Sequence, residues 1–396
     1  MSYASHIAVL LCLAFTVACS GEQGFGGFSG STASKKASDH NADDKQATKS
    51  SQTANNTSSK DQSPSVPGST PVGTKPAAGV DLNGIPHPDQ SSRSNGQVTD
   101  TFNLNKKIGQ QDIVWVIDNS SSMSNEISYV VQNFDRFLNT MKDRTDIKVA
   151  LISGETKPPA TYGVDLPASV AGVNIQKFSY EITSINALGV LAASSCALAT
   201  TVVTKANFGG VVLDQICGVT VPPRKVATVF HNEILASARG VLSGGFYRTS
   251  ANKIFVIVSD DEAQLVDSGI FTQAMSHAGI GPYKVFAFVA TDASTCSVSH
   301  VGKSYLNLAA ATGGQAFDIC ATDWGSTFED IGRRIVAAAR TRFAVSDASL
   351  KAITQVAIDG AVIPAGSYTF QGGVLTFKDG VVPPQAAELR VTYQVE

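Results

Sequence analysis

The sequence predicts an α/β protein built as a three-layer, doubly wound, mostly parallel sheet with helices on both faces. Two observations support this fold class. Near-continuous apolar runs rich in β-branched residues alternate with longer stretches whose apolar residues recur every three or four positions. The first pattern is typical of strands buried on both faces, and the second is typical of amphipathic helices. Their alternation favours parallel strands joined by helical crossovers.

The elements follow one another in a regular order. The strongest strand candidates cover residues 112–118, 147–152, 253–259 and 283–290. Helical spacing covers residues 127–141, 226–238, 270–275, 304–311 and 327–339. Residues 319–324 look like a further strand followed by a capped helix start. We therefore assign residues 106–342 to one α/β domain, with a poorly patterned insertion at about residues 154–223.

The chain before this domain has little core material. Residues 7–17 form an apolar run of signal-peptide length, too short to span a bilayer. It ends in Thr16-Val17-Ala18-Cys19, which resembles the lipobox of bacterial lipoproteins. That resemblance implies a signal peptide over residues 1–19 and a lipid anchor on Cys19. Because Ser20 is not the aspartate that retains such proteins at the inner membrane, it also implies the outer membrane, facing the periplasm or the exterior.

Two further regions flank the α/β domain. Residues 20–105 are rich in Ser, Gly and Thr, and we expect them to form a disordered tether. Residues 343–396 contain short β-type runs separated by Asp359-Gly360, Gly372-Gly373 and Asp379-Gly380, which are hairpin turn signals. We expect this region to form a small C-terminal β appendage.

Four cysteines remain beyond the signal peptide: Cys196, Cys217, Cys296 and Cys320. An even number of cysteines in an exported chain indicates disulfides. Four cysteines allow three pairings, of which Cys196–Cys217 and Cys296–Cys320 would close two short loops. CxxC-type spacing and clustered histidines are absent from the sequence, which argues against a metal-binding role for these thiols.

The segment Asp118-Asn119-Ser120-Ser121-Ser122 follows the first predicted strand directly. Ligands of open parallel sheets bind beyond the carboxyl ends of the strands. One carboxylate and two hydroxyls at that edge are hard oxygen ligands of the kind that Mg²⁺ prefers. The pattern resembles the metal-ion-dependent adhesion site (MIDAS), Asp-x-Ser-x-Ser, of von Willebrand factor A domains, which have a Rossmann-like fold. The resemblance covers about residues 110–342.

The resemblance implies further ligands. In that family an aspartate at the end of a later strand approaches the metal, and here Asp260 holds that place, with Asp261 as the alternative. A threonine from a loop before a helix also contributes, which points to Thr228, with Thr220 as the competitor. The implied cofactor is Mg²⁺, or Mn²⁺ or Ca²⁺. The implied partner is a protein that contributes an exposed carboxylate to the metal.

Other classes of function are weaker. The formal net charge of −3 gives no reason to expect a nucleic-acid partner. A phosphatase of the haloacid dehalogenase type would need a second carboxylate where Ser120 stands, and no Gly-x-Ser-x-Gly elbow supports a serine hydrolase. We therefore expect a non-enzymatic, metal-dependent adhesion or interaction module of the cell envelope. The alternatives are a structural envelope lipoprotein with a vestigial site and, with less support, a metal-dependent hydrolase.

Overall fold

The computed structural model describes residues 85–155, 162–183, 185–223, 229–292, 294–347, 349–378 and 380–395. The predicted signal peptide, the lipidation residue Cys19 and most of the predicted tether lie outside these residues. Within the described part of the chain, no helix has the length and apolar character needed to cross a membrane.

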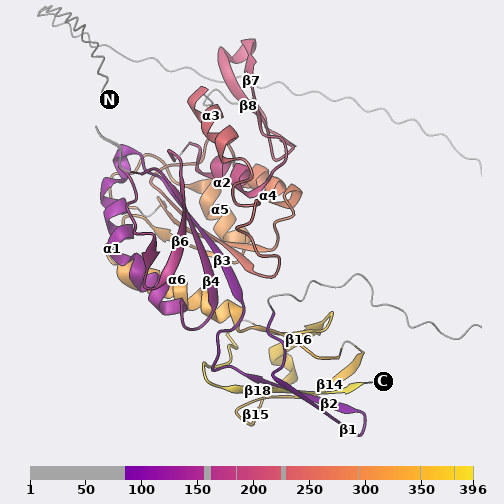
Figure 1. Ribbon diagram of the computed structural model, residues 1–396. Helices are drawn as coiled ribbons and strands as arrows, with labels where there is room; N and C mark the ends of the chain where they lie inside the picture. Colours follow the sequence, from indigo (N-terminus) through magenta and orange to yellow (C-terminus); the bar gives the residue numbers. More distant parts are fainter. Residues whose placement is uncertain are drawn as a thin grey trace, which may run out of the picture. The chain divides into compact units, whose positions relative to one another are not determined.

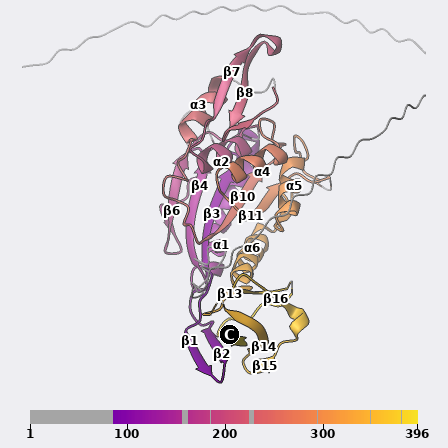
Figure 2. The same cartoon turned by 90° about the vertical axis from the view of Figure 1, so that its right-hand side faces the viewer.

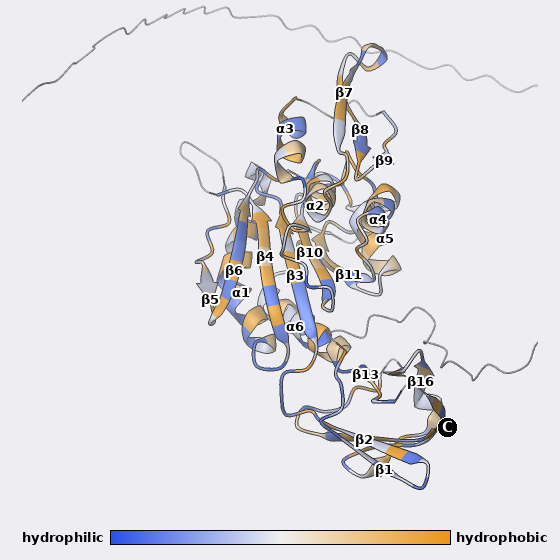
Figure 3. Cartoon of the chain, turned by 45° about the vertical axis from the view of Figure 1, so that its right-hand side comes forward, coloured by the Kyte–Doolittle hydropathy of each residue, from blue (hydrophilic) through white to orange (hydrophobic). Residues whose placement is uncertain are grey.

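A seven-stranded sheet forms the centre of the α/β domain (Figure 1). The strand order is β12-β11-β10-β3-β4-β6-β5, where β5 is the short strand Ser169–Val170. Every pair is parallel except β5 with β6. The predicted strands are confirmed as β3 (Gln110–Ile117), β4 (Asp146–Ser153), β10 (Asn252–Ser259) and β11 (Tyr283–Val289). Figure 3 shows that β3 begins hydrophilic and then becomes hydrophobic, although the polar residues Gln111 and Asp112 near its start are buried as fully as the apolar residues that follow.

Helices cover both faces of this sheet, which confirms the doubly wound fold class (Figure 2). On one face, α1 (Ser124–Met141) and α6 (Trp324–Ala339) pack around Trp115 of β3. The Trp115 ring lies 5.0 Å from Phe137 and 5.1 Å from Phe328, so aromatic contacts join both helices to the sheet. The other face is covered by α2 (Ala187–Ser195), α3 (Val229–Ala238), α4 (Ser268–His277) and α5 (Lys303–Ala311).

The interpretation of residues 154–223 as an insertion is wrong for part of that segment. Residues 173–179 form β6, which extends the central sheet beside β4, and α2 is buried along its whole length. Because every side of α2 is covered, its sequence has no polar face and shows no helical periodicity. The remainder includes a separate antiparallel sheet of β7 (Thr201–Lys205), β8 (Gly210–Ile216) and β9 (Val219–Thr220).

The strand expected within residues 319–324 lies earlier in the chain. β12 covers Gln315–Asp318 and pairs in parallel with β11. The helix start is confirmed, because the Asp323 carboxylate accepts a hydrogen bond from the Ser326 backbone N–H at 3.0 Å and caps α6.

The tether boundary at residue 105 also needs correction. β1 (Gln90–Ser94) and β2 (Gln97–Asn103) form a hairpin, and β2 pairs with β18 (Glu388–Val395). The appendage is therefore built from two chain segments, one before and one after the α/β domain in the sequence. Its five-stranded sheet has the order β1-β2-β18-β14-β15, where β14 is Leu350–Ile358 and β15 is Ala361–Val362. Its second sheet consists of β13 (Arg342–Ala344), β17 (Val374–Phe377) and β16 (Tyr368–Gln371).

Apolar packing explains why the early strands join the appendage. Val98 and Phe102 of β2 are buried with Phe343, Leu389 and Val391 in one core. Burial alternates along residues 97–103, where Val98, Asp100 and Phe102 are buried and their neighbours are more exposed, as in a strand with one covered face. At the hairpin tip, Asn95 and Gly96 both have positive φ, as a tight hairpin turn requires.

Both proposed disulfides are present. Cys196 and Cys217 have their Cα atoms 6.0 Å apart, and Cys296 and Cys320 have theirs 5.4 Å apart. The first bond joins the end of α2 to the turn between β8 and β9, and the second joins the loop after β11 to the loop after β12. The pairing between sequence neighbours is therefore confirmed.

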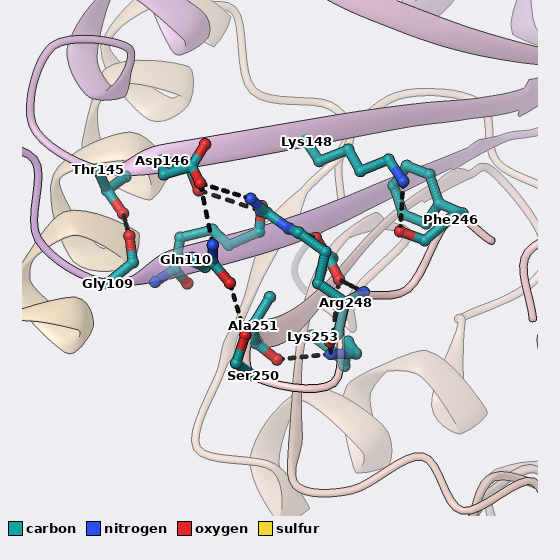
Figure 4. Close-up of polar contacts among 12 residues, drawn as sticks. Gly109, Gln110, Thr145, Asp146, Lys148, Phe246, Arg248, Ser250, Ala251 and Lys253 are labelled. Atoms are coloured by element: carbon teal, nitrogen blue, oxygen red, sulfur yellow. Dashed lines mark hydrogen bonds and ion pairs between the residues drawn. The ribbon is translucent and has the colours of Figure 1, made fainter. Parts of the chain in front are cut away.

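A charged network lies at the amino-terminal edge of the sheet (Figure 4). Arg248 donates to the buried Asp112 carboxylate at 2.7 Å and to Asp146 at 2.7 Å. The Lys253 ammonium donates to the backbone carbonyls of Arg248 and Ala251 and lies 3.5 Å from Asp112. A buried carboxylate is thus neutralised by two cations, which fixes the loop before β10 to the start of β3.

Candidate metal site

The loop of residues 118–122, called here the metal-site loop, begins where β3 ends. The Asp118 backbone N–H donates to the Val258 carbonyl at 2.9 Å, so the pairing of β3 with β10 continues into the loop. The Asp118 side chain is fully buried, and its Oδ1 accepts a hydrogen bond from the Ser120 backbone N–H at 2.9 Å. The Oγ atoms of Ser120 and Ser122 lie 3.1 Å apart. The structure therefore brings the three residues of the Asp-x-Ser-x-Ser motif together.

Asn119 fixes the loop to its neighbours, a role that the sequence motif does not specify. Its side-chain Oδ1 accepts hydrogen bonds from the backbone N–H groups of Gly154 at 3.2 Å and Ile182 at 2.7 Å. A Cβ atom at Gly154 would lie only 2.4 Å from Asn119 Nδ2, so any larger residue here would displace the Asn119 side chain. The metal-site loop is held by the ends of β3, β4 and β10 and by the segment before α2.

The end of β10 brings a second carboxylate to the loop. Asp260 is 6% exposed, and burial raises its pKa, against a hydrogen bond from the Ser122 hydroxyl that lowers it. The Asp261 carboxylate instead contacts His300, with its Oδ1 atom 2.7 Å from His300 Nδ1. Of the two alternatives, Asp260 is therefore the one that meets the metal-site loop.

The electrostatics of the site are dominated by buried negative charge. Burial raises the pKa of Asp118 to about 6, against hydrogen bonds from Ser120 and Ser259 that lower it, and the Asp260 charge raises it further. Burial also raises the pKa of Glu126, at the start of α1, with a further contribution from Asp260. Within the described residues, no ion pair joins Asp118 or Asp260 to a cationic side chain.

These donors fit a hard divalent cation. Two carboxylates and two hydroxyls are the oxygen ligands that Mg²⁺ and Mn²⁺ take, and water would supply the remaining positions. A cation would also neutralise buried charge that no neighbouring side chain compensates. The described residues contain no group of three or more His, Cys, Asp or Glu side chains suited to a metal. The fit therefore depends on Ser120 and Ser122 as ligands beside Asp118 and Asp260.

The sequence argument missed three neighbours of the site. The Ser259 hydroxyl donates to Asp118 Oδ2 at 3.0 Å, so it orients the carboxylate. Glu126 has a buried Oε2 with no hydrogen-bond partner. Tyr305 of α5 is fully buried beside Ser259, and burial, with the charges of Asp118 and Glu262, raises its pKa well above the usual value. The only sequence signal for Ser259 was its position immediately before Asp260.

The other predicted residues are not placed at this site. Thr228 lies outside the described residues, so its proposed ligand role stays a prediction. Thr220 is exposed on β9 and pairs with Gln215 in the small antiparallel sheet. Glu262, the third acidic residue of the segment after β10, accepts hydrogen bonds from the Ser304 backbone N–H at 3.1 Å and so caps α5.

Comparisons with known proteins give the fold context. No known protein family and no curated protein matches the chain. Among solved structures, the pilus adhesin SpaC from Lactobacillus rhamnosus GG, in its open conformation, has 13% sequence identity and a TM-score of 0.28. That match covers 77% of this chain and 42% of SpaC. The ArnB paralog VWA2 from Sulfolobus acidocaldarius has 11% identity and a TM-score of 0.28, and the match covers 79% of this chain and 64% of VWA2.

The chain thus spans less than two thirds of the length of either protein. At these TM-scores, the fold class rests on the chain's own sheet topology. That topology is the doubly wound α/β arrangement that the resemblance to von Willebrand factor A domains implies.

Proposed function

We propose that this protein is a metal-dependent protein-binding module of the bacterial cell envelope, acting in adhesion or interaction. The main support is the meeting of Asp118, Ser120, Ser122 and Asp260 at the carboxyl edge of a parallel sheet. These residues would hold Mg²⁺, or Mn²⁺ or Ca²⁺, and Thr228 is the proposed fifth contributor. The bound cation would supply an open coordination position for a carboxylate of the partner protein.

The chain's own residues prepare this site for a cation rather than for turnover. Ser259 and the Ser120 backbone N–H orient the Asp118 carboxylate, and Asn119 fixes the loop. Each Asp118 oxygen accepts one of these hydrogen bonds and keeps a lone pair that a cation would use. The arrangement supports a binding role, and we propose that the protein is not an enzyme.

Anchoring belongs to the same proposal. The lipobox-like Thr16-Val17-Ala18-Cys19 would place a lipid on Cys19 and hold the protein at the outer membrane. Metabolic labelling with an alkyne-tagged fatty acid tests this step, because the Cys19→Ser chain should lose the label and the unchanged chain should carry it.

The metal test uses thermal unfolding of the full chain with and without Mg²⁺ or Mn²⁺. We expect the cation to raise the melting temperature of the unchanged protein but not of the Asp118→Ala variant. Asp261→Asn is the matched control, because Asp261 pairs with His300, and it should keep the metal response. An unchanged melting curve in the presence of metal would show that the site is vestigial and favour a purely structural envelope protein.

The partner test is a pull-down from envelope extracts with and without EDTA. Metal-dependent binding predicts partners that EDTA releases and that Asp118→Ala fails to capture. Partners captured equally under both conditions would rule out the metal as the contact. A panel of phosphatase and esterase substrates with Mg²⁺ tests the remaining hydrolase alternative, and metal-dependent turnover lost in Asp118→Ala would overturn the non-enzymatic assignment.

A further inference from the structure

A cavity opens at the amino-terminal edge of the central sheet, at the opposite ends of the strands from the metal-site loop. Its volume is about 450 Å³, within the range of small-molecule sites. The starts of β10 and β11, the last turn of α6 and the loop after β17 form its walls. The Phe377 backbone N–H donates to the Thr341 carbonyl at 2.8 Å, which fixes that loop beside α6.

The lining of this cavity is basic. It includes Lys253, Lys284, Arg334, Arg342 and Lys378, and none of the described residues that line it is acidic. We call it the basic cavity. Its cations project from strands, a helix and a loop that are distant in the sequence, so the positive charge is gathered by the fold rather than by a local charge run.

Two of these five cations already have carboxylate partners. Lys253 lies 3.5 Å from Asp112, and Arg334 donates to Asp330 at 2.7 Å. Lys284 donates to the Gly313 backbone carbonyl at 3.0 Å, a contact that leaves its charge uncompensated.

Three positive charges therefore face the cavity without a carboxylate partner in the described part of the chain. They belong to Lys284, Arg342 and Lys378.

A buried amide gives an independent sign of a ligand. Gln111 lines the cavity and is fully buried, yet its Nε2 and Oε1 atoms have no hydrogen-bond partner. Buried side-chain amides are nearly always hydrogen-bonded, because leaving both atoms unpaired is costly. Reaching both atoms requires the side chains that cover this amide to shift, and a ligand with polar atoms at this end of the cavity would then satisfy them.

The rest of the lining suits an organic group. Ile254, Phe286 and Val382 contribute apolar surface beside the cations. On the inner side, the network in Figure 4 holds the Lys253 ammonium against the carbonyls of Arg248 and Ala251, so its position is fixed before any ligand enters. A preformed site of this kind loses little conformational freedom on binding.

We propose that the basic cavity binds a small phosphate-bearing organic anion. A phosphate monoester carries nearly two negative charges near neutral pH and accepts several hydrogen bonds. Lysine and arginine are the side chains that bind phosphate. The three positive charges of Lys284, Arg342 and Lys378 therefore suit a phosphate ligand better than a ligand with a single carboxylate. Gln111 pairs with the polar part of the same ligand. The phosphate belongs either to a free metabolite or to a lipid headgroup.

The test measures thermal unfolding of the full chain in EDTA, so that the metal site stays empty and the result is independent of the proposed function. The free probes are inorganic phosphate and glycerol 3-phosphate. We expect a saturable rise in melting temperature, absent with chloride at matched ionic strength. Lys284→Gln and Lys378→Gln should each raise the apparent Kd at least about fivefold, since each removes a charge-assisted hydrogen bond. Lys351→Gln, an exposed cation on β14, is the matched control and should leave the Kd unchanged.

Vesicles separate the two sources of phosphate. The Cys19→Ser chain, which lacks the proposed lipidation residue, is sedimented with vesicles of phosphatidylcholine alone or with added phosphatidic acid. Binding that needs phosphatidic acid and weakens in Lys284→Gln assigns the cavity to a headgroup, and binding of glycerol 3-phosphate alone assigns it to a metabolite. Failure of every probe overturns the proposal, and so does an equal loss of binding in Lys351→Gln. If Lys284→Gln or Lys378→Gln fails to fold, the Gln111→Leu variant tests the same site through its amide, and an unchanged Kd in that variant overturns the proposal.

Discussion

The Asp118→Asn substitution should make the metal-free protein more stable at neutral pH. Folding raises the pKa of Asp118 from 3.8 to about 6, mainly through burial. The unfolded chain therefore releases this proton at lower pH than the folded chain does. Stability of the metal-free protein falls as the pH rises from about 4 to about 6, and the loss persists above that range.

The size of the effect follows from that pKa difference. Because the carboxylate ionises less readily in the folded than in the unfolded chain, the charge on Asp118 lowers the free energy of unfolding by about 3 kcal/mol at pH 7.5, at about 1.4 kcal/mol for each pKa unit. Asparagine removes the charge and preserves the shape. Its Oδ1 still accepts from the Ser120 N–H, and its amide donates to the Ser259 hydroxyl, which can rotate to accept. We expect the variant to gain up to about 3 kcal/mol, or roughly 5 °C in melting temperature.

The assay is urea unfolding followed by tryptophan fluorescence in EDTA. Both tryptophans of the chain, Trp115 of β3 and Trp324 of α6, are buried in the core on the α1 and α6 face of the sheet, so their emission reports on the α/β domain. The stability gap between variant and unchanged protein should shrink to about 1 kcal/mol at pH 4.5, where the folded unchanged protein keeps Asp118 protonated. A gap that does not change with pH, or a variant less stable at pH 7.5, would refute the electrostatic account. Adding Mg²⁺ should stabilise only the unchanged protein.

Three further substitutions test other parts of the structure. Gly154→Ala should cost about 1–3 kcal/mol and weaken the metal response, because the new Cβ displaces the Asn119 side chain from its hydrogen bonds; an unchanged metal titration would contradict this. Arg248→Met should cost about 3–5 kcal/mol by leaving Asp112 undercompensated, and chemical denaturation that shows no loss would argue against the network of Figure 4. Phe102→Ala should cost about 3–5 kcal/mol in the appendage, measured by hydrogen exchange of β18 amides, whereas unchanged exchange would separate β2 from the appendage core.

Local sequence patterns were sufficient where a residue's role depends on its own neighbours. The apolar run before Asp118 predicted β3, and the small hydroxyl residues after it predicted the metal-site loop. At the end of β10 the family resemblance implied Asp260, with Asp261 as the alternative, and the structure brings Asp260 to the metal-site loop. These features share one cause: side chains at the end of a buried strand reach the edge of the sheet whatever the rest of the chain does.

Features that depend on long-range pairing were missed. β2 was assigned to the tether because its short alternating pattern follows a low-complexity stretch, although Asn95-Gly96 is a strong hairpin signal. The role of Gln111 in the basic cavity and that of Asn119 in fixing the loop depend on partners more than thirty residues away. No periodicity reports such contacts, because they arise only when separate elements pack together.

The sharing of one sheet by β2 and β18 also sets an order of folding. Thr99 and Thr392, whose hydroxyls lie 3.1 Å apart across these strands, are 293 positions apart in the chain. β2 precedes the α/β domain in the sequence, and its partner β18 follows that domain. Because the α/β domain is continuous in the chain, we expect it to form before the two strands pair. Phe102 and Phe343, on either side of it, have ring centroids 5.1 Å apart. Once that domain has formed, the segments that enter and leave it lie close together. Pairing β2 with β18 then no longer has the entropy cost of closing a flexible loop of hundreds of residues.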